Sequence, residues 1–429
     1  MKDPRYEYEQ SLNKGTEQGR PAADVRFSPN GAAKLQGQQP GKIQGASLGG
    51  DEKGSAISPY LPEMVTMDLI SRPTAHRVTL AALFKAMGDN NASDLHLTPG
   101  VSPIFRVNGD IFISNLPVIS NEDLETILIP LLNEDQYMKF NEAGDIDFAI
   151  EVPRFARYRI NYYAHHRGIG AVFRMIPLVP RDIEDLNLPP VVKNIVEFKR
   201  GLVLVTGPTG SGKTTTLAAM LNYLNRNRNA HIITIEDPLE YVHINNKCLI
   251  THRELGVHAN SFADALRASI REDPDVILVG EMRDMETMDL ALKAAEMGLL
   301  VLSTLHTIDA AKSVDRIIDS FPLKQQEQIR LVLSQTLKAV IAQQLVKRKD
   351  LEGRYPAVEV LIATKGLSSL IRDGKTHQIS SIIQTGADVG MQSLDQAFID
   401  LIRKGIIRKE EVRSKVNDIK LFERAGITF

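Results

Sequence analysis

The sequence has little cysteine, no tryptophan, almost no net charge and no long apolar run. Its single cysteine, Cys248, excludes a disulfide within the chain and a zinc site made of four cysteines. The net charge of -2 gives the chain as a whole none of the basic character that marks nucleic-acid-binding domains. No apolar run approaches the roughly 18 residues of a membrane-spanning helix, and the N-terminal residues MKDPRYEYEQ lack the apolar segment of a signal peptide. These absences predict a cytoplasmic protein.

The remaining composition is that of a globular protein with more than one domain. Hydrophobic residues make up 43% and charged residues 24% of the 429 residues, which allows a sizeable core and suggests two or three domains. Residues 1–57 are an exception, because they are rich in Gly, Gln, Pro and Ser and show no apolar period. We expect residues 1–57 to form a disordered N-terminal arm.

Residues 76–176 predict a small α+β domain. An amphipathic helix is predicted over 79–87 (TLAALFKAM). Short strands are predicted over SDLHL, SPIFRVNGDIF, DIDFAIEV, ARYRINYYAH and GAVFRMI, with a hairpin turn at NGD. A proline-rich stretch, PLVPRDIEDLNLPP, begins at residue 177, and we expect residues 177–194 to be a linker.

Residues 195–322 differ in character and predict a parallel α/β sheet. Four apolar segments, GLVLVTG, HIITIED, DVILVGE and LLVLSTLH, are each followed by helix-like sequence. Such runs, rich in Val, Ile and Leu, are typical of parallel strands that are buried on both faces. Residues 323–429 are predicted to be a helical C-terminal region, because apolar residues recur at helical spacing near its end, as in SLDQAFIDLIRKG.

The first of these strands runs into GPTGSGKTTTL, which fits the phosphate-loop pattern G-x-x-x-x-G-K-[ST]. The glycines let the backbone N–H groups turn toward phosphate oxygens, and the following helix adds the positive end of its dipole. Lys213 can reach the outer phosphates, and the Thr214 hydroxyl can bind Mg²⁺. An ordinary glycine-rich loop is the alternative, but the buried strand before it and the helix after it favour a site for ATP and Mg²⁺. The predicted nucleotide-binding residues are Gly207, Pro208, Thr209, Gly210, Ser211, Gly212, Lys213, Thr214 and Thr215.

Acidic residues follow two of the predicted strands. Glu236, Asp237 and Glu240 gather at the end of the second strand, where like charges repel unless a cation, a ligand or water stabilises them. Glu281 ends the third strand, at the place where phosphate-loop ATPases usually have an Asp that holds Mg²⁺, and the longer Glu favours contact through water. Parallel strands end at one edge of a sheet, so these acids are expected near the phosphate loop. The alternatives are a solvated turn at Pro238 and a surface acid at Glu281.

The fourth predicted strand ends in His306, at the same edge of the sheet. A histidine on an apolar strand is usually a core residue with satisfied hydrogen bonds. At this edge His306 could instead form a hydrogen bond near the γ-phosphate and report the phosphate state.

The phosphate loop and the segments TIEDPLEY, LVGEMRD and STLHT, in this order and spacing, resemble the secretion and type IV pilus ATPases. In that family they are the Walker A, Asp, Walker B and His boxes. The resemblance covers residues 76–405, including SDLHL and FRVNGDI in the first domain. It implies an α/β fold in which a RecA-like phosphate-loop ATPase domain follows a small α+β (PAS-like) N-terminal domain and precedes a helical C-terminal tail.

The resemblance also implies roles for individual residues. Lys213 and Thr214 would bind phosphate and Mg²⁺, and Glu240 would be the catalytic glutamate. Glu281 would be the Walker B acid, with Mg²⁺ bound through water, and His306 the His-box residue. The family forms hexamers of two-domain subunits, in which a neighbour completes the ATP site between the domains. We therefore expect a homo-hexamer.

Arginines complete such sites in the family. Arg159 and Arg174 occur in the first domain, whereas Arg267 and Arg271 lie four apart in the helix-like segment SFADALRASIREDPD. The family uses arginines at these four positions around the nucleotide, so all four are candidate catalytic residues. A surface salt bridge or a solvated charge is the alternative for each.

Within the family, the sequence is most similar to the retraction ATPases of twitching motility. Assembly-type members usually have a four-cysteine zinc motif, which one cysteine excludes. The tail GLSSLIRDGKTHQI matches the retraction group at Leu370, Ile371 and Arg372, with Asp373 in place of Glu, whereas 366–369 depart from it. MQSLDQ also resembles that group. Expected partners are the hexamer and an inner-membrane pilus platform protein, which would place the chain at the cytoplasmic face of the inner membrane.

Other functions remain alternatives. The departure at 366–369 leaves an accessory retraction paralogue open, and an assembly or type II secretion ATPase is a further possibility. A nucleic-acid translocase would need a basic groove with stacking aromatics, against which stand the net charge of -2 and 6% aromatic residues, so no direct nucleic-acid partner is expected. A nucleotide-gated binding module without hydrolysis is disfavoured by Lys213, Glu240 and Glu281.

Overall fold

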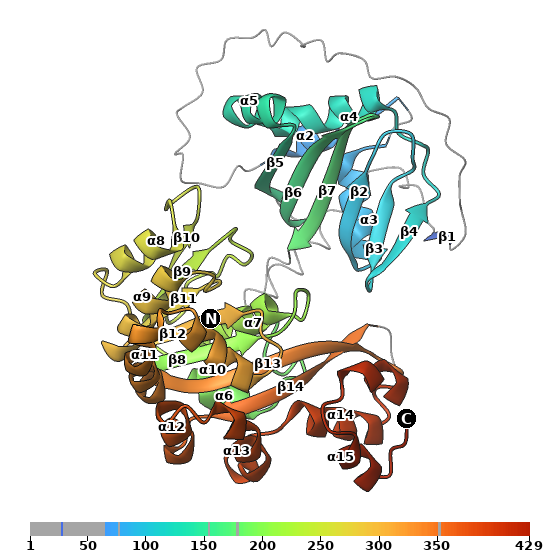
Figure 1. Cartoon of the computed structure of the whole chain (residues 1–429). Helices are drawn as coiled ribbons and strands as arrows, with labels where there is room; N and C mark the ends of the chain where they lie inside the picture. Colours follow the sequence, from blue (N-terminus) through green and yellow to red (C-terminus); the bar gives the residue numbers. More distant parts are fainter. Residues whose placement is uncertain (1–26, 29–64, 76–77, 153–154, 177–179, 351–352) are drawn as a thin grey trace. The chain divides into compact units, whose positions relative to one another are not determined.

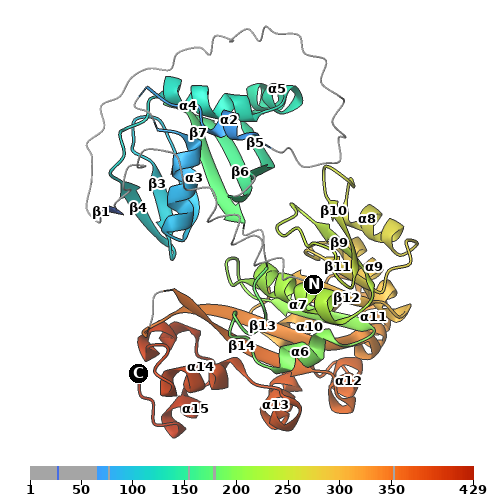
Figure 2. The same cartoon turned by 180° about the vertical axis from the view of Figure 1, so that it is seen from behind.

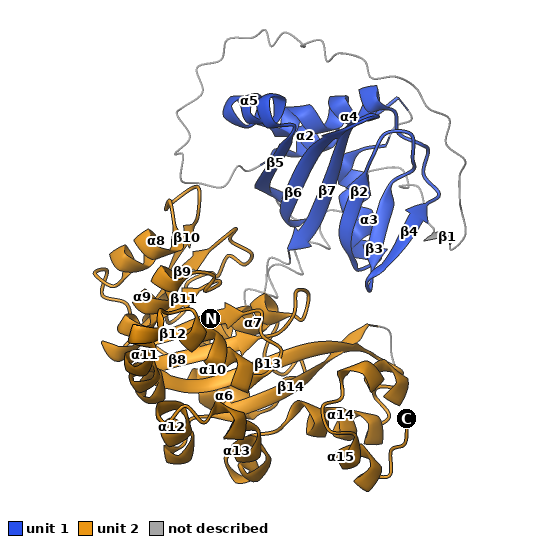
Figure 3. Cartoon of the chain, in the orientation of Figure 1, with its two compact units in different colours: residues 1–178 blue, residues 179–429 orange. Residues whose placement is uncertain are grey.

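The chain divides into two compact units, Met1–Leu178 and Val179–Phe429 (Figure 3). Each unit has a seven-stranded sheet in the computed structural model. Of the arm predicted for 1–57, all but Phe27–Ser28 (β1) lies outside the described residues, and β1 pairs with strand β4. The structure describes residues 27–28, 65–75, 78–152, 155–176, 180–350 and 353–429.

Unit 1 is an antiparallel sheet with helices packed against one face (Figure 1). Its strand order is β1-β4-β3-β2-β7-β6-β5. The strands are β2 Ala92–Leu97, β3 Ile104–Val107, β4 Asp110–Ser114, β5 Asp145–Val152, β6 Ala156–His165 and β7 Gly168–Ile176. The helices are α2 Met67–Ile70, α3 Leu80–Asp89, α4 Asn121–Leu128 and α5 Glu134–Ala143, with a 3-10 turn at Ile129–Leu131.

Local sequence explains the order within unit 1. Thr79 caps α3 by accepting a hydrogen bond from Ala82 N–H, and the ring of Phe84 on α3 stacks on Tyr158 of β6 with centroids 4.1 Å apart. Asn108 and Gly109 turn β3 into β4 with φ of 53° and 97°, as a tight hairpin requires. The predicted helix, the strands and the NGD turn of this domain are confirmed.

Unit 2 is a mostly parallel sheet with helices on both faces. Its strand order is β10-β9-β11-β12-β8-β13-β14, and only β14 is antiparallel to its neighbour. The four predicted parallel strands are confirmed as β8 Gly201–Thr206, β9 His231–Glu236, β11 Val276–Val279 and β12 Leu300–Leu305. The remaining strands are β10 Leu249–Glu254, β13 Leu337–Lys347 and β14 Arg354–Ile362.

Alternate residues of the central strands pack into two different cores. Leu202 and Leu204 of β8 pack with residues of α8 to α13, whereas Val203 and Val205 pack with α6 and α7 on the opposite face (Figures 1 and 2). A smaller cluster joins the ends of β13 and β14 to α14 and α15. The helices are α6 Val191–Val196, α7 Lys213–Asn227, α8 Phe262–Ser269, α9 Met285–Glu296, α10 Ala310–Asp319, α11 Leu323–Thr336, α12 Lys365–Arg372, α13 Ile379–Thr385, α14 Leu394–Arg403 and α15 Ile419–Arg424.

The prediction that residues 323–429 are helical is correct for α11 and for α12 to α15, but it is wrong for β13 and β14. Strand β13 pairs with β8 and is buried among the central strands, although Lys338, Gln343 and Gln344 interrupt its apolar run. The predicted linker 177–194 likewise includes the start of α6. In the part of the chain that the structure describes, no helix has the length and apolarity to cross a membrane.

Candidate nucleotide-binding site

The glycine-rich loop 207–212 connects the end of β8 to the start of α7. Gly207, Gly210 and Gly212 have φ of 145°, 77° and 87°, a region that residues with a side chain rarely adopt. A Cβ at Gly207 would lie 2.2 Å from the Gln343 carbonyl oxygen, so only glycine fits there. The loop thus leads directly into the N-terminus of a helix, where backbone N–H groups and the helix dipole favour a phosphate group.

Lys213, the first residue of α7, contacts the loop and the end of a neighbouring strand. Its Nζ donates hydrogen bonds to the carbonyl oxygens of Gly207 at 2.9 Å and Pro208 at 3.2 Å, and it lies 3.4 Å from His306 Nδ1. Burial lowers the pKa of Lys213 from its ordinary value, while the charges of Glu281 and Glu240 act in the opposite direction. The lysine is therefore close to both of these acids.

Glu281 and His306 extend this contact chain along the sheet edge. His306 Nε2 lies 3.0 Å from Glu281 Oε1, and Arg283 Nε lies 2.9 Å from Glu281 Oε2. The side chain of Glu281 is 18% exposed, whereas that of His306 is 48% exposed. The structure thus brings together the phosphate-loop lysine, the acid after β11 and the histidine after β12, because parallel strands end at one edge.

The acids that follow β9 differ in their surroundings. Glu236 is buried, with 7% of its surface exposed, and its Oε2 accepts a hydrogen bond from the Glu240 backbone N–H at 3.5 Å. Burial raises the pKa of Glu236 to about 7, so this carboxyl is often neutral near neutral pH. Glu240 is only partly buried, and its negative charge favours the protonated form of Lys213 and so raises the pKa of that lysine. Because Glu236 is buried and often neutral, the repulsion among the three acids after β9 is weaker than their sequence suggests.

Oxygen atoms suited to Mg²⁺ occur at this edge. The Thr214 hydroxyl lies in the first turn of α7, and Glu281 supplies a carboxylate. Among the described residues, no group of three or more His, Cys, Asp and Glu side chains could hold a metal ion by itself. That donor set fits Mg²⁺, which usually binds one or two protein oxygens together with substrate phosphates and water.

Arg159 and Arg174, two of the predicted arginines, lie side by side in unit 1. They are cross-strand neighbours on β6 and β7, so their side chains share one face of the sheet. Arg174 Nε donates to Asp94 Oδ1 at 2.8 Å, and Asp94 is almost fully buried on β2. This ion pair orients Arg174 on the sheet face, where 61% of its side chain is exposed.

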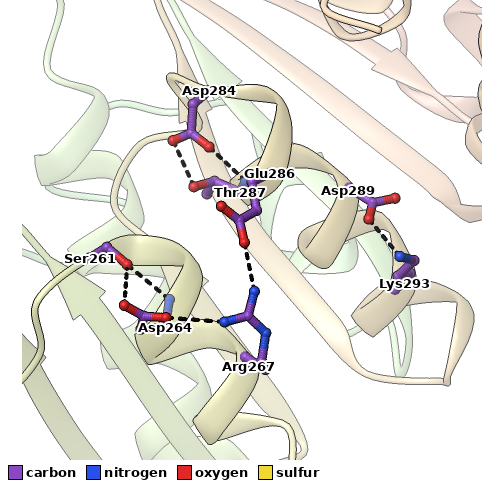
Figure 4. A network of polar contacts seen from close by, with 8 residues as sticks. All are labelled: Ser261, Asp264, Arg267, Asp284, Glu286, Thr287, Asp289 and Lys293. Atoms are coloured by element: carbon purple, nitrogen blue, oxygen red, sulfur yellow. Dashed lines mark hydrogen bonds and ion pairs between the residues drawn. The ribbon is translucent and has the colours of Figure 1, made fainter.

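Arg267 joins two helices of unit 2 (Figure 4). It lies on α8 and forms ion pairs with Asp264 at 3.0 Å and with Glu286 of α9 at 2.6 Å. In Figure 4 its guanidinium points between these two carboxylates. Arg271 follows the end of α8 at Ser269, so the prediction that both arginines lie on one face of the same helix is wrong.

Gln343 of β13 also contacts the phosphate loop, and it is not among the residues predicted from the sequence. Its side-chain nitrogen donates to the Ser211 carbonyl oxygen at 2.7 Å, and its side-chain oxygen accepts from the Thr216 hydroxyl at 2.8 Å. A polar residue inside the apolar run AVIAQQLV is the one available signal, but the sequence pattern predicts a helical region there. Without the strand, Gln343 could not be placed beside the loop.

This arrangement defines a phosphate-loop nucleotide-binding protein: a parallel strand, a glycine loop, a lysine at the helix start and an acid at a neighbouring strand end. Residues 177–413 match the family described as type II/IV secretion system protein, and the chain belongs to that family. The resemblance found in the four boxes is confirmed.

Similar proteins narrow the position within the family. The chain is 48% identical over 324 residues to the type IV pilus retractation ATPase PilT of Pseudomonas aeruginosa. The matched region covers 76% of this chain and 94% of that protein. It is 49% identical over 317 residues to a twitching motility protein of Neisseria gonorrhoeae, covering 74% and 85%. The crystal structure of the pilus retraction motor PilT with bound ADP has a TM-score of 0.74 at 41% identity, covering 81% of this chain and all of that one.

Proposed function

We propose that this protein is an ATP-hydrolysing motor that powers the retraction of type IV pili, the movement behind twitching motility. The observation that carries the proposal is the contact chain from Glu281 through His306 to Lys213 beside the phosphate loop. A retraction ATPase is similar to this chain over 94% of its own length, including the region of that contact chain.

The residues divide the chemistry among them. Backbone N–H groups of loop 207–212 bind the phosphates, and Lys213 neutralises charge on the outer ones. Glu240 orients the attacking water and accepts its proton, as a general base does. Thr214 and Glu281 would hold Mg²⁺, Glu281 through water, and the ion would supply positive charge beside the phosphates. His306 contacts both Glu281 and Lys213, so it is placed to respond to the loss of the γ-phosphate.

The working form is a homo-hexamer that acts on an inner-membrane pilus platform protein from the cytoplasmic side, without direct nucleic-acid binding. In this arrangement Arg159 and Arg174 complete the site of a neighbouring subunit. Arg267 and Arg271 belong to the same candidate set, but the two ion pairs of Arg267 favour a role in holding α8 against α9.

An accessory retraction role is the second candidate, because residues 366–369 depart from the retraction motif. These residues lie in α12, where Leu367 and Ile371 are buried and Arg372 is exposed at the C-terminal end. The apolar side of α12 is therefore intact. The residues that differ from the retraction motif lie in the first turn of this helix.

Lys213→Ala is expected to weaken ATP binding by about a hundredfold, because hydrogen bonds from a charged donor to phosphate contribute about 1.5–3 kcal/mol each. Binding of a fluorescent ATP analogue measures this effect. Lys293→Ala is the matched control, since Lys293 forms an ion pair with Asp289 on the surface of α9. Unchanged ATP affinity in Lys213→Ala would contradict the phosphate-loop assignment.

Deletion of the gene tests the direction of the motor. We expect cells that keep surface pili but do not twitch, and we expect the wild-type gene and Lys293→Ala, but not Lys213→Ala, to restore movement. Cells without pili would indicate an assembly ATPase, and normal twitching would indicate an accessory role.

ATPase assays with and without single-stranded DNA distinguish a retraction motor from a nucleic-acid translocase, because only a translocase should be stimulated by the DNA.

A further inference from the structure

The side-chain amide of Gln343 spans the end of the phosphate loop and the start of α7. Gln343, Ser211 and Thr216 are all buried, with 3%, 2% and 1% of their surfaces exposed. The amide nitrogen donates to Ser211 O at 2.7 Å and the amide oxygen accepts from Thr216 Oγ1 at 2.8 Å. Both ends of the amide are thus used, and each partner belongs to the segment that carries Lys213.

The loop is also in close contact with the backbone of Gln343. Strand β13 pairs with β8 up to Ala342 and Thr206, so Gln343 comes directly after the last residue that is paired with β8. A Cβ at Gly207 would meet Gln343 O at 2.2 Å, and one at Gly212 would meet Gln343 Nε2 at 2.9 Å. Gly207 is therefore required partly because of the Gln343 backbone, and Gly212 lies against the end of the same side chain.

Peptide geometry connects the Gln343 contact to phosphate binding. The Ser211 carbonyl and the Gly212 N–H belong to the same planar trans peptide unit, so they point in opposite directions. Because the Gln343 amide holds the carbonyl toward β13, the Gly212 N–H must point away from β13. Backbone N–H groups of this loop are the donors that a phosphate group needs.

We propose that Gln343 is a positioning residue of the ATPase site, which fixes the Ser211–Gly212 peptide so that the loop is preorganised for the phosphates of ATP. It does not touch the reacting atoms. Its effect is on binding: loss of the contact lets the peptide rotate, and the free loop then has to be reordered each time a nucleotide binds. The inference rests on the proposed ATPase activity.

Gln343→Met tests this role, because Met has a similar length but makes neither hydrogen bond. We expect KM for ATP and Kd for ADP to rise by about tenfold or more, with kcat within about threefold, the pattern of lost binding that is equal in the ground and transition states. Affinity for adenosine, which has no phosphate, should change by less than about threefold.

Thr216→Val is the matched control. It removes the other hydrogen bond of the same amide and leaves the Ser211 contact in place. We expect Thr216→Val to lower Tm about as much as Gln343→Met does but to keep KM within about threefold of wild type, because only the Ser211 bond fixes the loop peptide. A merely structural role would lower Tm in both variants and leave KM unchanged in both.

The KM values of the two variants decide between a positioning role and a merely structural role of Gln343. An unchanged KM in folded Gln343→Met, or an equal rise of KM in Thr216→Val, would overturn the proposal. If Gln343→Met does not fold, Gln343→Asn keeps an amide that is too short for both partners, and its KM and Kd for ADP are judged by the same limits. Wild-type protein that binds ADP without hydrolysing ATP would refute the proposed function but not this contact, since Kd for ADP still reports it.

Discussion

Glu240→Gln is expected to leave ATP binding nearly unchanged while hydrolysis falls by about a hundredfold or more, the usual effect of losing a positioned general base. Gln has the size of Glu but cannot accept a proton from water. Glu240 is partly buried in the turn after β9, near Lys213, and it is joined through its backbone to the buried Glu236. Steady-state turnover and the affinity for a fluorescent ATP analogue give the two numbers that are compared.

Glu236→Gln is the informative neighbour of that variant. Burial raises the pKa of Glu236 to about 7, so Gln resembles the protonated form that is already common near neutral pH. It should therefore reduce turnover by less than about tenfold. Glu296→Gln, at an exposed site on α9, controls for the general loss of a negative charge. Turnover within threefold of wild type in Glu240→Gln, or a larger loss in Glu236→Gln, would remove Glu240 from the role of base.

The part of the site that could be predicted from the sequence is the part that lies directly after apolar strands. Lys213, Glu281 and His306 each follow a strand that is rich in Val, Ile and Leu, and the contacts among them follow from the parallel arrangement of those strands. No remote partner is needed to place them. Their chemical roles remain predictions, whereas their proximity is an observation.

Other features depend on partners far away in the sequence. Two adjacent glutamines interrupt the apolar run of β13, so its sequence does not show the pattern of a buried strand. Its place becomes clear only from its pairing with β8 and its contact with the phosphate loop. Arg267 is similar, because Glu286 is 19 residues further along the chain and belongs to another helix. Helical spacing placed Arg267 on a helix, but it could not show which acid of another helix it meets.

Arg159→Ala is expected to lower hydrolysis by about a hundredfold or more, since an arginine supplied by a neighbouring subunit contributes roughly 10³ to 10⁵ in rate where it completes a phosphoryl-transfer site. Arg159 and Arg174 are cross-strand neighbours in unit 1, whereas the phosphate loop belongs to unit 2. ATPase assays of the purified protein measure the loss. Arg167→Ala, at another arginine of unit 1, is the matched control and should stay near wild type.

Mixing two inactive variants distinguishes a shared site from a site within one chain. Subunits with Arg159→Ala keep an intact phosphate loop, and subunits with Lys213→Ala keep an intact Arg159. If the arginine acts on the neighbour, about one interface in four of an equal, random mixture pairs a good loop with a good arginine, because each ring interface is head-to-tail. Activity should then return to about a quarter of the wild-type value.

The two competing roles of Arg159 predict a different result for the same mixture. If the arginine acts within its own chain, or only supports the fold of unit 1, neither parent subunit can repair the other, and the mixture has no more activity than its separate components. Light scattering must first show that both variants form hexamers, because subunits that do not assemble would give the same negative result. Activity that rises with the fraction of mixed rings would therefore show that Arg159 acts on the nucleotide site of a neighbouring subunit.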